Sequence, residues 1–174
     1  MTIASSQTKR PIRIEGEVAY IQLTRGYEAV IDAADVPLVN SFNWHATVIG
    51  RSVYAGRTER LLDGKRVTVL LHRFIMAAPD SLQVDHRNGD GLDNQRVNLR
   101  LATRAQNNRN RRMNATSTSG VKGVRWHKRR GKWFAAITLD GKQRHLGYFL
   151  NTAEAAAAYA AASAQFHGDF GRTA

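Results

Sequence analysis

The chain has 174 residues and a net charge of +12, from 26 Lys and Arg against 14 Asp and Glu. This surplus favours a polyanionic partner, nucleic acid before any other, while the length allows one domain or two small ones. The absence of cysteine excludes disulfides and thiolate zinc sites, and no apolar run approaches the roughly 20 residues of a membrane span. Because the N-terminus also lacks the apolar core of a signal peptide, we expect a soluble protein of the cytoplasm.

The first part of the chain predicts a small β-rich unit with its own aromatic core, over residues 13–71. Period-2 alternation and β-branched residues favour short strands in four segments. These are residues 13–23, 28–31, 54–57 and 67–71. A short helix is expected within residues 32–42, and the Asp-Gly turn at 62–65 favours a hairpin between the last two strands.

The central part predicts the order strand, long ordered loop, strand, helix. A short amphipathic helix at residues 71–76 comes first, and a strand at 83–86 follows it. Asn, Asp and Gly between residues 88 and 91 are typical of an ordered loop. The second strand is expected at 98–102, and Thr103 is a good N-cap for a helix that ends near Arg112.

The last part predicts a three-stranded sheet and one helix after a polar linker at residues 113–119. Three β-segments are separated by the turns Arg130-Gly131 and Asp140-Gly141. They are residues 123–127, 132–139 and 142–149. Residues 151–154 resemble a capping box, with Asn in place of Ser or Thr, and open an alanine-rich helix to about Phe166.

Asp85 and His86 stand side by side at the end of the predicted strand 83–86. A carboxylate offers a ligand for a hard metal ion, and an imidazole with an ordinary pKa of about 6.5 offers a base, the minimum for metal-assisted phosphodiester hydrolysis. Adjacent strand residues normally point to opposite faces, so the pair can share a site only if the strand end is twisted or bulged. The alternative is that the pair is a polar strand end and the Asn residues after it cap turns.

The residues around this pair follow a recognisable order and spacing. They are Leu71-His72-Arg73, residues 84–90, Asp93-Asn94, residues 97–100, Ala102-Thr103 and Gln106-Asn107. Together they resemble the HNH nuclease motif of phage and intron homing endonucleases, over residues 71–112. The resemblance implies a ββα-metal hairpin and helix around one divalent ion, most readily Mg²⁺, with Mn²⁺ as the alternative.

The resemblance also implies a role for four residues. Asp85 and Asn107 would each supply an oxygen ligand to the metal ion, and His86 would be the general base that deprotonates the attacking water. Asn98 would be the middle Asn, which ties down the loop and orients His86. An Mg²⁺-type ion prefers a few oxygen ligands completed by waters and phosphate, which agrees with this donor set.

Two further polar residues are expected to support the site. Asn94 is predicted to brace the loop rather than to act in catalysis. His72 lies between a predicted strand and an apolar helix, so we interpret it as structural or as a phosphate contact.

The positive charge is concentrated from Arg96 to Lys132, where twelve Lys and Arg occur without a single Asp or Glu. A solvated basic face is one interpretation of the helix in this stretch. Beside a metal and phosphate site, contact with the DNA backbone is the favoured interpretation. The helix residues concerned are Arg104, Arg109, Arg111 and Arg112.

The C-terminal turns, aromatic residues and helix follow a second recognisable order and spacing, at residues 120–126, 131–135, 145–149 and 152–159. They resemble an AP2 (ERF-type) DNA-binding domain, which implies a three-stranded sheet in the major groove. The candidate DNA contacts are Arg125, Trp126, Lys128, Arg130, Lys132, Trp133 and Arg144. The alternative for Trp126 and Trp133 is that they are core aromatics against the alanine-rich helix.

We therefore expect an α+β protein with three parts and one linker. These are residues 1–70 (β-rich, with a scaffold or DNA-contact role), 71–112 (HNH ββα-metal core), 113–119 (linker) and 120–174 (AP2-like domain).

The predicted function is a metal-dependent homing-type endonuclease that hydrolyses double-stranded DNA, in the cytoplasm of a phage-infected or bacterial host cell. A monomer or weak dimer is expected, without a membrane partner, and one site per monomer should nick one strand per binding event. The first alternative is a DNA-binding regulator with a vestigial nuclease site, against which the presence of Asp85, His86 and Asn107 argues. An RNA-binding protein fits the charge but not the AP2 resemblance.

Overall fold

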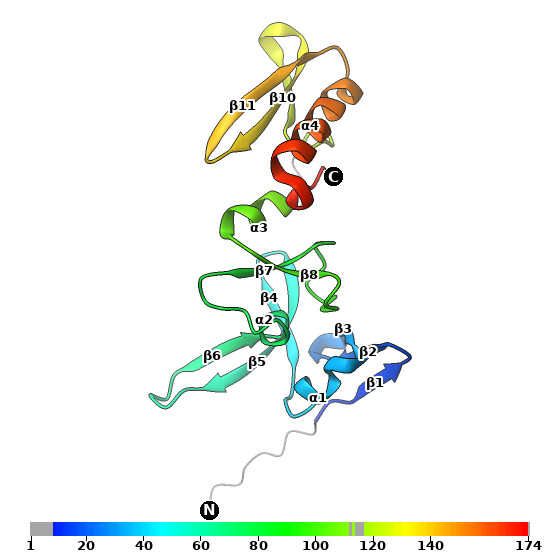
Figure 1. Cartoon of the computed structure of the whole chain (residues 1–174), viewed down its shortest axis with the longest axis vertical. Coiled ribbons are helices and arrows are strands. Elements are labelled where there is room, and N and C mark those ends of the chain that lie inside the picture. Colours follow the sequence, from blue (N-terminus) through cyan, green and yellow to red (C-terminus); the bar gives the residue numbers. More distant parts are fainter. Residues whose placement is uncertain (1–8, 112, 114–116, 174) are drawn as a thin grey trace, which may run out of the picture. The chain divides into compact units, whose positions relative to one another are not determined.

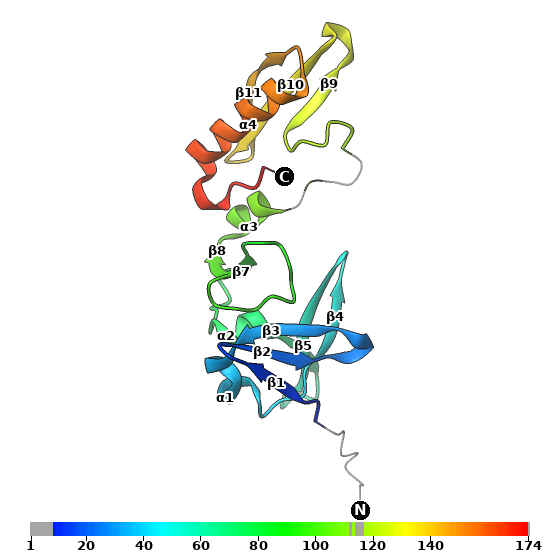
Figure 2. The same cartoon turned by 90° about the vertical axis from the view of Figure 1, so that its right-hand side faces the viewer.

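The computed structural model describes residues 9–111, 113 and 117–173 of the chain. The chain divides into two compact units, Met1–Thr103 and Arg104–Ala174, each with its own hydrophobic core. Figures 1 and 2 show the elements of both units. Among the described residues, no helix is long and apolar enough to cross a membrane.

The N-terminal unit is built from two three-stranded antiparallel sheets and one two-stranded ladder, in the orders β1-β2-β3, β4-β5-β6 and β7-β8. Its strands are β1 (Ile12–Glu15), β2 (Val18–Gln22), β3 (Glu28–Asp32), β4 (His45–Ile49), β5 (Ser52–Arg60), β6 (Arg66–Leu70), β7 (Gln83–His86) and β8 (Leu99–Ala102). Its helical segments are η1 (Thr24–Gly26), η2 (Ala33–Asp35), α1 (Val36–Val39) and α2 (Leu71–Ile75).

Most of these elements were predictable from the alternation of apolar residues. The expected strands, the short helix within residues 32–42, the helix after residue 71 and the hairpin around the 62–65 turn are all present. The sequence did not predict β4, whose burial pattern has only Ala46 fully buried and therefore gives a weak periodic signal.

One hydrophobic core joins all three sheets of this unit. Apolar residues of β2 and β3 share it with Leu71 of α2, Val84 of β7 and Leu99 of β8. Trp44 is its largest fully buried side chain, and its indole N–H donates to the carbonyl of Val39 at 3.1 Å. The strand β7, which carries both Asp85 and His86, and its partner β8 are therefore packed directly against the elements that precede them.

The long loop between β7 and β8 is held against the first sheet. Val30 of β3 donates to the carbonyl of Leu92 at 2.8 Å, and its own carbonyl accepts from the amide of Asn94 at 2.7 Å. Arg96 reaches the buried carboxylate of Asp35 with Nη2 at 2.7 Å and Nε at 3.0 Å. These contacts fix the loop as a rigid part of the unit.

The C-terminal unit contains one three-stranded antiparallel sheet, in the order β11-β10-β9, and helices at both ends. Its elements are α3 (Arg104–Asn110), β9 (Val124–His127), η3 (Lys128–Arg130), β10 (Lys132–Leu139), β11 (Lys142–Phe149), α4 (Thr152–His167) and η4 (Gly168–Phe170). The three predicted strands and the alanine-rich helix are confirmed. Figure 2 shows α4 lying along the sheet.

The start of α4 has the forward hydrogen bond of the expected capping box. The side chain of Asn151 accepts from the amide of Glu154 at 2.8 Å, and the Glu154 carboxylate accepts from the amide of Leu150 at 3.4 Å. Ala155, Tyr159 and Ala162 then bury one side of the helix against the sheet. Asn thus replaces Ser or Thr at the N-cap, and the Glu154 carboxylate also accepts from the Asn151 side chain at 2.9 Å.

Candidate active site

Asp85 is paired with a cation inside the N-terminal unit. It lies opposite Arg100 in the β7–β8 ladder, and both side chains are buried, at 4% and 8% exposed. Nε and Nη2 of Arg100 lie 2.7 and 2.6 Å from the same carboxylate oxygen, Oδ2. Such a charge-assisted pair offsets the cost of burying the carboxylate. Arg100 was not predicted as this partner, although pairing residues 83–86 with 99–102 in antiparallel register places it opposite Asp85.

His86 contacts a different set of side chains. The β7–β8 pairing runs residue by residue from Gln83 to His86, so alternation directs His86 to the opposite face from Asp85. Its Nε2 lies 3.5 Å from Oδ1 of Asn94, and its ring centroid lies 4.8 Å from that of His72 and 5.9 Å from that of Tyr54. That Asp85 and His86 serve one site therefore stays a prediction.

The surroundings of His86 favour a neutral imidazole. Burial lowers the pKa of His86, and the hydrogen bond with Asn94 and the nearby carboxylates, Asp85 first, oppose that shift. Asn94 donates through Nδ2 to the carbonyl of Leu92 at 2.9 Å, so its Oδ1 is the atom that faces the imidazole. Because that oxygen only accepts, this contact favours the tautomer of the neutral ring that carries its proton on Nε2.

Asn98 braces the loop in the manner that the resemblance implies. Its Oδ1 accepts from the amide of Asn88 at 3.0 Å, and its Nδ2 donates to Asn88 Oδ1 at 3.1 Å and to the Asp93 carbonyl at 2.8 Å. The contact with the imidazole of His86, however, comes from Asn94, which is fully buried. Asn98 thus braces the loop, while Asn94 contacts the ring of His86. The role of each residue in a reaction stays a prediction.

His72 lies in the same buried cluster. It is the second residue of α2, its ring packs edge-on against His86, and Tyr54 lies 5.5 Å away between ring centroids. Its Nδ1 is buried and has no hydrogen-bond partner among the described residues. Burial, the neighbouring His86 and Arg73 lower the pKa of His72 to about 3, so the ring is neutral at physiological pH. This environment favours packing over phosphate contact.

The remaining predicted residues of the HNH motif belong to the C-terminal unit. Asn107 is half-buried on α3, and its role as a metal ligand beside Asp85 stays a prediction. Arg109 forms a salt bridge with Asp140 at 3.8 Å. The carbonyls of Arg109 and Arg111 both accept from Nζ of Lys122.

The other two arginines of this helix stay candidates for DNA contact. Arg104 is exposed at the start of α3, and Arg112 lies outside the described residues.

A metal ion at this site would have to rely on few protein ligands. Across the part of the chain that the structure describes, no group of three His, Cys, Asp or Glu residues converges on one point. The donors predicted here are instead one carboxylate and one amide oxygen, from Asp85 and Asn107. Both are hard oxygen ligands, and such a sparse set completed by water and phosphate is typical of Mg²⁺ sites.

The predicted DNA contacts of the sheet fall into two groups. Those that are exposed and keep this role open are Arg125, Trp126, Lys128, Arg130, Lys132 and Arg144, whereas Trp133 is half-buried. Trp133 packs against the hydrophobic core that α4 shares, and Trp126 lies beside it with ring centroids 5.2 Å apart. Arg144 lies over the ring of Phe166 at 5.2 Å. The packing of Trp133 matches the alternative of a core aromatic.

Comparison with known proteins identifies the central segment. Residues 70–109 match the family model of the HNH endonuclease. The chain carries an HNH endonuclease domain at these residues. This domain includes Asp85, His86, Asn94 and Asn98, the residues whose contacts are described above, and it also includes Asn107.

The chain is also similar to one curated phage protein. It is 37% identical over 67 residues to "Protein 3.8" of Escherichia phage T7, which corresponds to 38% of this chain and 55% of that protein. The chain thus spans about half the length of this relative. No solved structure matches the chain. Because the family match ends at residue 109, the AP2-like nature of the C-terminal sheet and helix stays a prediction.

Proposed function

We propose that the protein is a metal-dependent endonuclease that hydrolyses phosphodiester bonds in DNA. The HNH domain at residues 70–109 supports this reaction class. The observation that carries the proposal is the environment of His86, which is buried, favoured in its neutral form and held by Asn94 through Nε2. A general base needs a neutral imidazole at neutral pH, and burial favours that form of His86.

In the proposed reaction, the neutral imidazole of His86 takes a proton from the attacking water. Asn94 keeps the ring in the required tautomer, and Asn98 holds the loop in place. Asp85 and Asn107 would hold a divalent ion, Mg²⁺ or Mn²⁺. When bound, such an ion supplies positive charge that stabilises the scissile phosphate and the leaving oxygen.

The C-terminal unit is proposed to bind the DNA duplex. Residues 104–174 contain 13 Lys and Arg but only three acidic residues, so this unit carries most of the net charge of +12. Phosphate contacts by such a surface position the duplex without choosing its sequence. The AP2 resemblance and the observed three-stranded sheet with its helix support this role.

We further propose that the enzyme is of homing type and nicks one strand per binding event. The resemblance to phage and intron enzymes supports the first point. The single Asp85-His86 pair in the chain supports the second, because one site can reach one scissile phosphate at a time.

One observation favours the alternative of a DNA-binding regulator with a vestigial site. Oδ2 of Asp85 is engaged by Nε and Nη2 of Arg100, so a metal ion would have to share this carboxylate or displace the guanidinium. A regulator would bind DNA in the same way and leave it intact.

Plasmid cleavage by the full chain separates these functions. Supercoiled plasmid is incubated with Mg²⁺ or Mn²⁺, with and without EDTA, and the products are resolved as nicked or linear DNA. We expect nicked circles that EDTA abolishes, and retained binding with loss of nicking in His86→Ala. Absence of cleavage with every divalent ion tested would favour the regulator. Cleavage by His86→Ala at the wild-type rate would overturn the assignment of the base.

A further inference from the structure

The sheet of the C-terminal unit has a second face that the sequence analysis did not resolve. Val124, Trp133 and Leu146 belong to the core that α4 covers. Alternation therefore directs their neighbours to the opposite face. We call this the ring face, and define it by Arg125, His127, Arg130, Phe134, His145 and Tyr148.

A β-bulge brings the rings of β11 together on this face. The pairing of β10 with β11 shifts between Ala135 and Ala136, where Gly147 is followed in the register by His145. The extra residue resets the alternation, so His145 and Tyr148 both point to the ring face, with ring centroids 4.8 Å apart. Gly147 is needed there, because its φ is 150° and a Cβ would lie 2.8 Å from the ring of Phe149.

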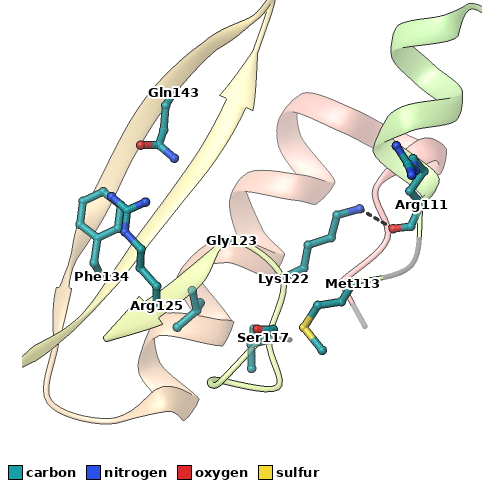
Figure 3. Close-up of a pocket in the computed structure, with 10 residues that line it drawn as sticks. Arg111, Met113, Ser117, Lys122, Gly123, Arg125, Phe134 and Gln143 are labelled. Carbon is teal, nitrogen blue, oxygen red and sulfur yellow. Dashed lines mark hydrogen bonds between the residues drawn. The ribbon is translucent and has the colours of Figure 1, made fainter. Parts of the chain in front are cut away.

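Two arginines lie on these rings. The guanidinium of Arg125 lies 4.5 Å from the centroid of Phe134, and that of Arg130 lies 4.6 Å from the centroid of Tyr148. Figure 3 shows Arg125 beside Phe134, at the wall of a hollow of about 400 Å³ that Lys122 and Met113 also line. Within the described parts of the chain, neither guanidinium forms a salt bridge with a carboxylate.

The rings are themselves held in place by further contacts. Phe134 stacks on His145 with centroids 4.9 Å apart and 17° between planes, and meets Tyr148 at 5.5 Å. His127 contacts Tyr148 at 5.2 Å, and its Nδ1 accepts from the amide of Arg130 at 3.3 Å. The rings therefore form a connected cluster, while Arg125 and Arg130 on it stay exposed.

A guanidinium stacked on an aromatic ring keeps its N–H groups in its own plane, where they can donate to a ligand. The stacked side chain also has fewer conformations to lose when it binds. The three carboxylates of this unit lie elsewhere: Asp140 in the β10–β11 turn, Glu154 at the start of α4 and Asp169 in η4. The ring face thus presents two arginine side chains that are positioned by aromatic rings and can bind a polyanion.

We propose that Phe134 and Tyr148 are positioning residues for DNA binding, each of which orients one arginine toward the duplex: Phe134 orients Arg125, and Tyr148 orients Arg130. This inference rests on the proposed function, because it requires DNA as the ligand. Two other roles are distinguishable from it. The rings could contact DNA directly, or they could serve only the stability of the sheet.

The test is a double-mutant cycle on the full chain, with a fluorescein-labelled 40-base-pair duplex as the probe. Anisotropy in EDTA gives the Kd of wild type, Phe134→Leu, Arg125→Met and the double variant. If Phe134 acts through Arg125, we expect each single variant to weaken binding about 3- to 10-fold, and the double variant to bind like Arg125→Met alone. Tyr148→Leu and Arg130→Met form a second cycle with the same expectation.

Two further variants and two further measurements make the result specific. Phe134→Tyr keeps the ring and should bind like wild type. Trp126→Leu removes an exposed aromatic from the other face and should show no coupling to Arg125→Met. Arg125→Met should lower the slope of log K against log salt by about one. Urea unfolding of each variant checks that the fold is retained.

The possible outcomes separate the two proposals. If wild type binds and nicks DNA but the losses of Phe134→Leu and Arg125→Met multiply, the positioning role is wrong and the proposed function stands. The same follows if Phe134→Leu binds like wild type. If wild type binds no duplex at all, the proposed function fails and the positioning role fails with it.

Discussion

Asp85 and Arg100 face each other across the β7–β8 ladder, with Nη2 of Arg100 only 2.6 Å from Oδ2 of Asp85. Both side chains are buried, so removal of one partner leaves a charge in a site with little solvent. We expect Arg100→Met to lower the free energy of unfolding by about 3–5 kcal/mol, measured by urea denaturation.

The control for this prediction is Arg51→Met, which changes an exposed arginine and should leave stability within about 0.5 kcal/mol of wild type. The double variant Asp85→Asn with Arg100→Met should recover part of the loss, because it removes both charges. An Arg100→Met protein that unfolds at the wild-type urea concentration would show that the pair contributes nothing to folding.

The Asp85–Arg100 pair also shows where sequence reasoning ends. The two strands, the loop and the spacing of Asp85, His86 and Asn98 were predictable, since short strands and Asx-rich loops have local signals. The partners of these residues were not. Arg100 is reached only through the strand register, and Tyr54 comes from β5, far away in the sequence.

The same limit on prediction from sequence applies to the C-terminal sheet. Its strands and capping box have local signals, and all were predicted. The side to which the residues of β11 point depends on the bulge near Gly147, which no local pattern announces. Which face of the sheet α4 covers is also a tertiary feature, so the sequence pointed to Trp133, which packs in the core, and not to Phe134 or Tyr148.

The lowered pKa of His72 predicts that the folded protein loses stability in acid. Its pKa is lowered from 6.5 to about 3 in the folded protein, so the unfolded chain binds a proton that the folded chain refuses between these values. The contribution of the neutral ring to the free energy of unfolding is complete above pH 6.5 and is lost progressively as the pH falls toward 3. The upper limit of this loss is about 5 kcal/mol.

We expect His72→Gln to flatten the dependence of unfolding free energy on pH between 6.5 and 4, measured by urea denaturation at several pH values. The comparison uses the difference between each pH and pH 8, so that any loss of packing common to all conditions cancels. Parallel pH curves for wild type and variant would contradict the prediction.

Gly91 lies in the loop between β7 and β8, at a position that leaves no room for a side chain. A Cβ there would lie 2.4 Å from the carbonyl oxygen of Val53 and 2.6 Å from the ring of Tyr54. Because a backbone atom is one of the two, the loop must shift to accept it. We expect Gly91→Ala to cost about 1–3 kcal/mol in urea denaturation and to weaken nicking.

The matched control is Gly50→Ala, where nothing lies within 4 Å of the added Cβ and only the positive φ of 61° opposes the change. This variant should lose about 1 kcal/mol and keep full nicking activity. Equal effects of the two substitutions on nicking would show that the position of the loop does not matter for the site.

Asn94 yields the sharpest test of how His86 is held. Its Oδ1 faces Nε2 of His86 at 3.5 Å, and its Nδ2 donates to the carbonyl of Leu92 at 2.9 Å. Asn94→Leu keeps the volume but removes the acceptor that selects the tautomer. We expect the nicking rate to fall about 100-fold or more while duplex affinity stays unchanged. Asn40→Leu, at an exposed position, should nick at the wild-type rate.

The dependence on His86 is checked by combining the two changes. If Asn94 acts through the imidazole, the double variant His86→Ala with Asn94→Leu should cut no more slowly than His86→Ala alone, since the group that Asn94 orients is already gone. A further loss in the double variant would mean that Asn94 serves the reaction by a separate route, for instance by holding the loop against β3, where its amide donates to the carbonyl of Val30 at 2.7 Å.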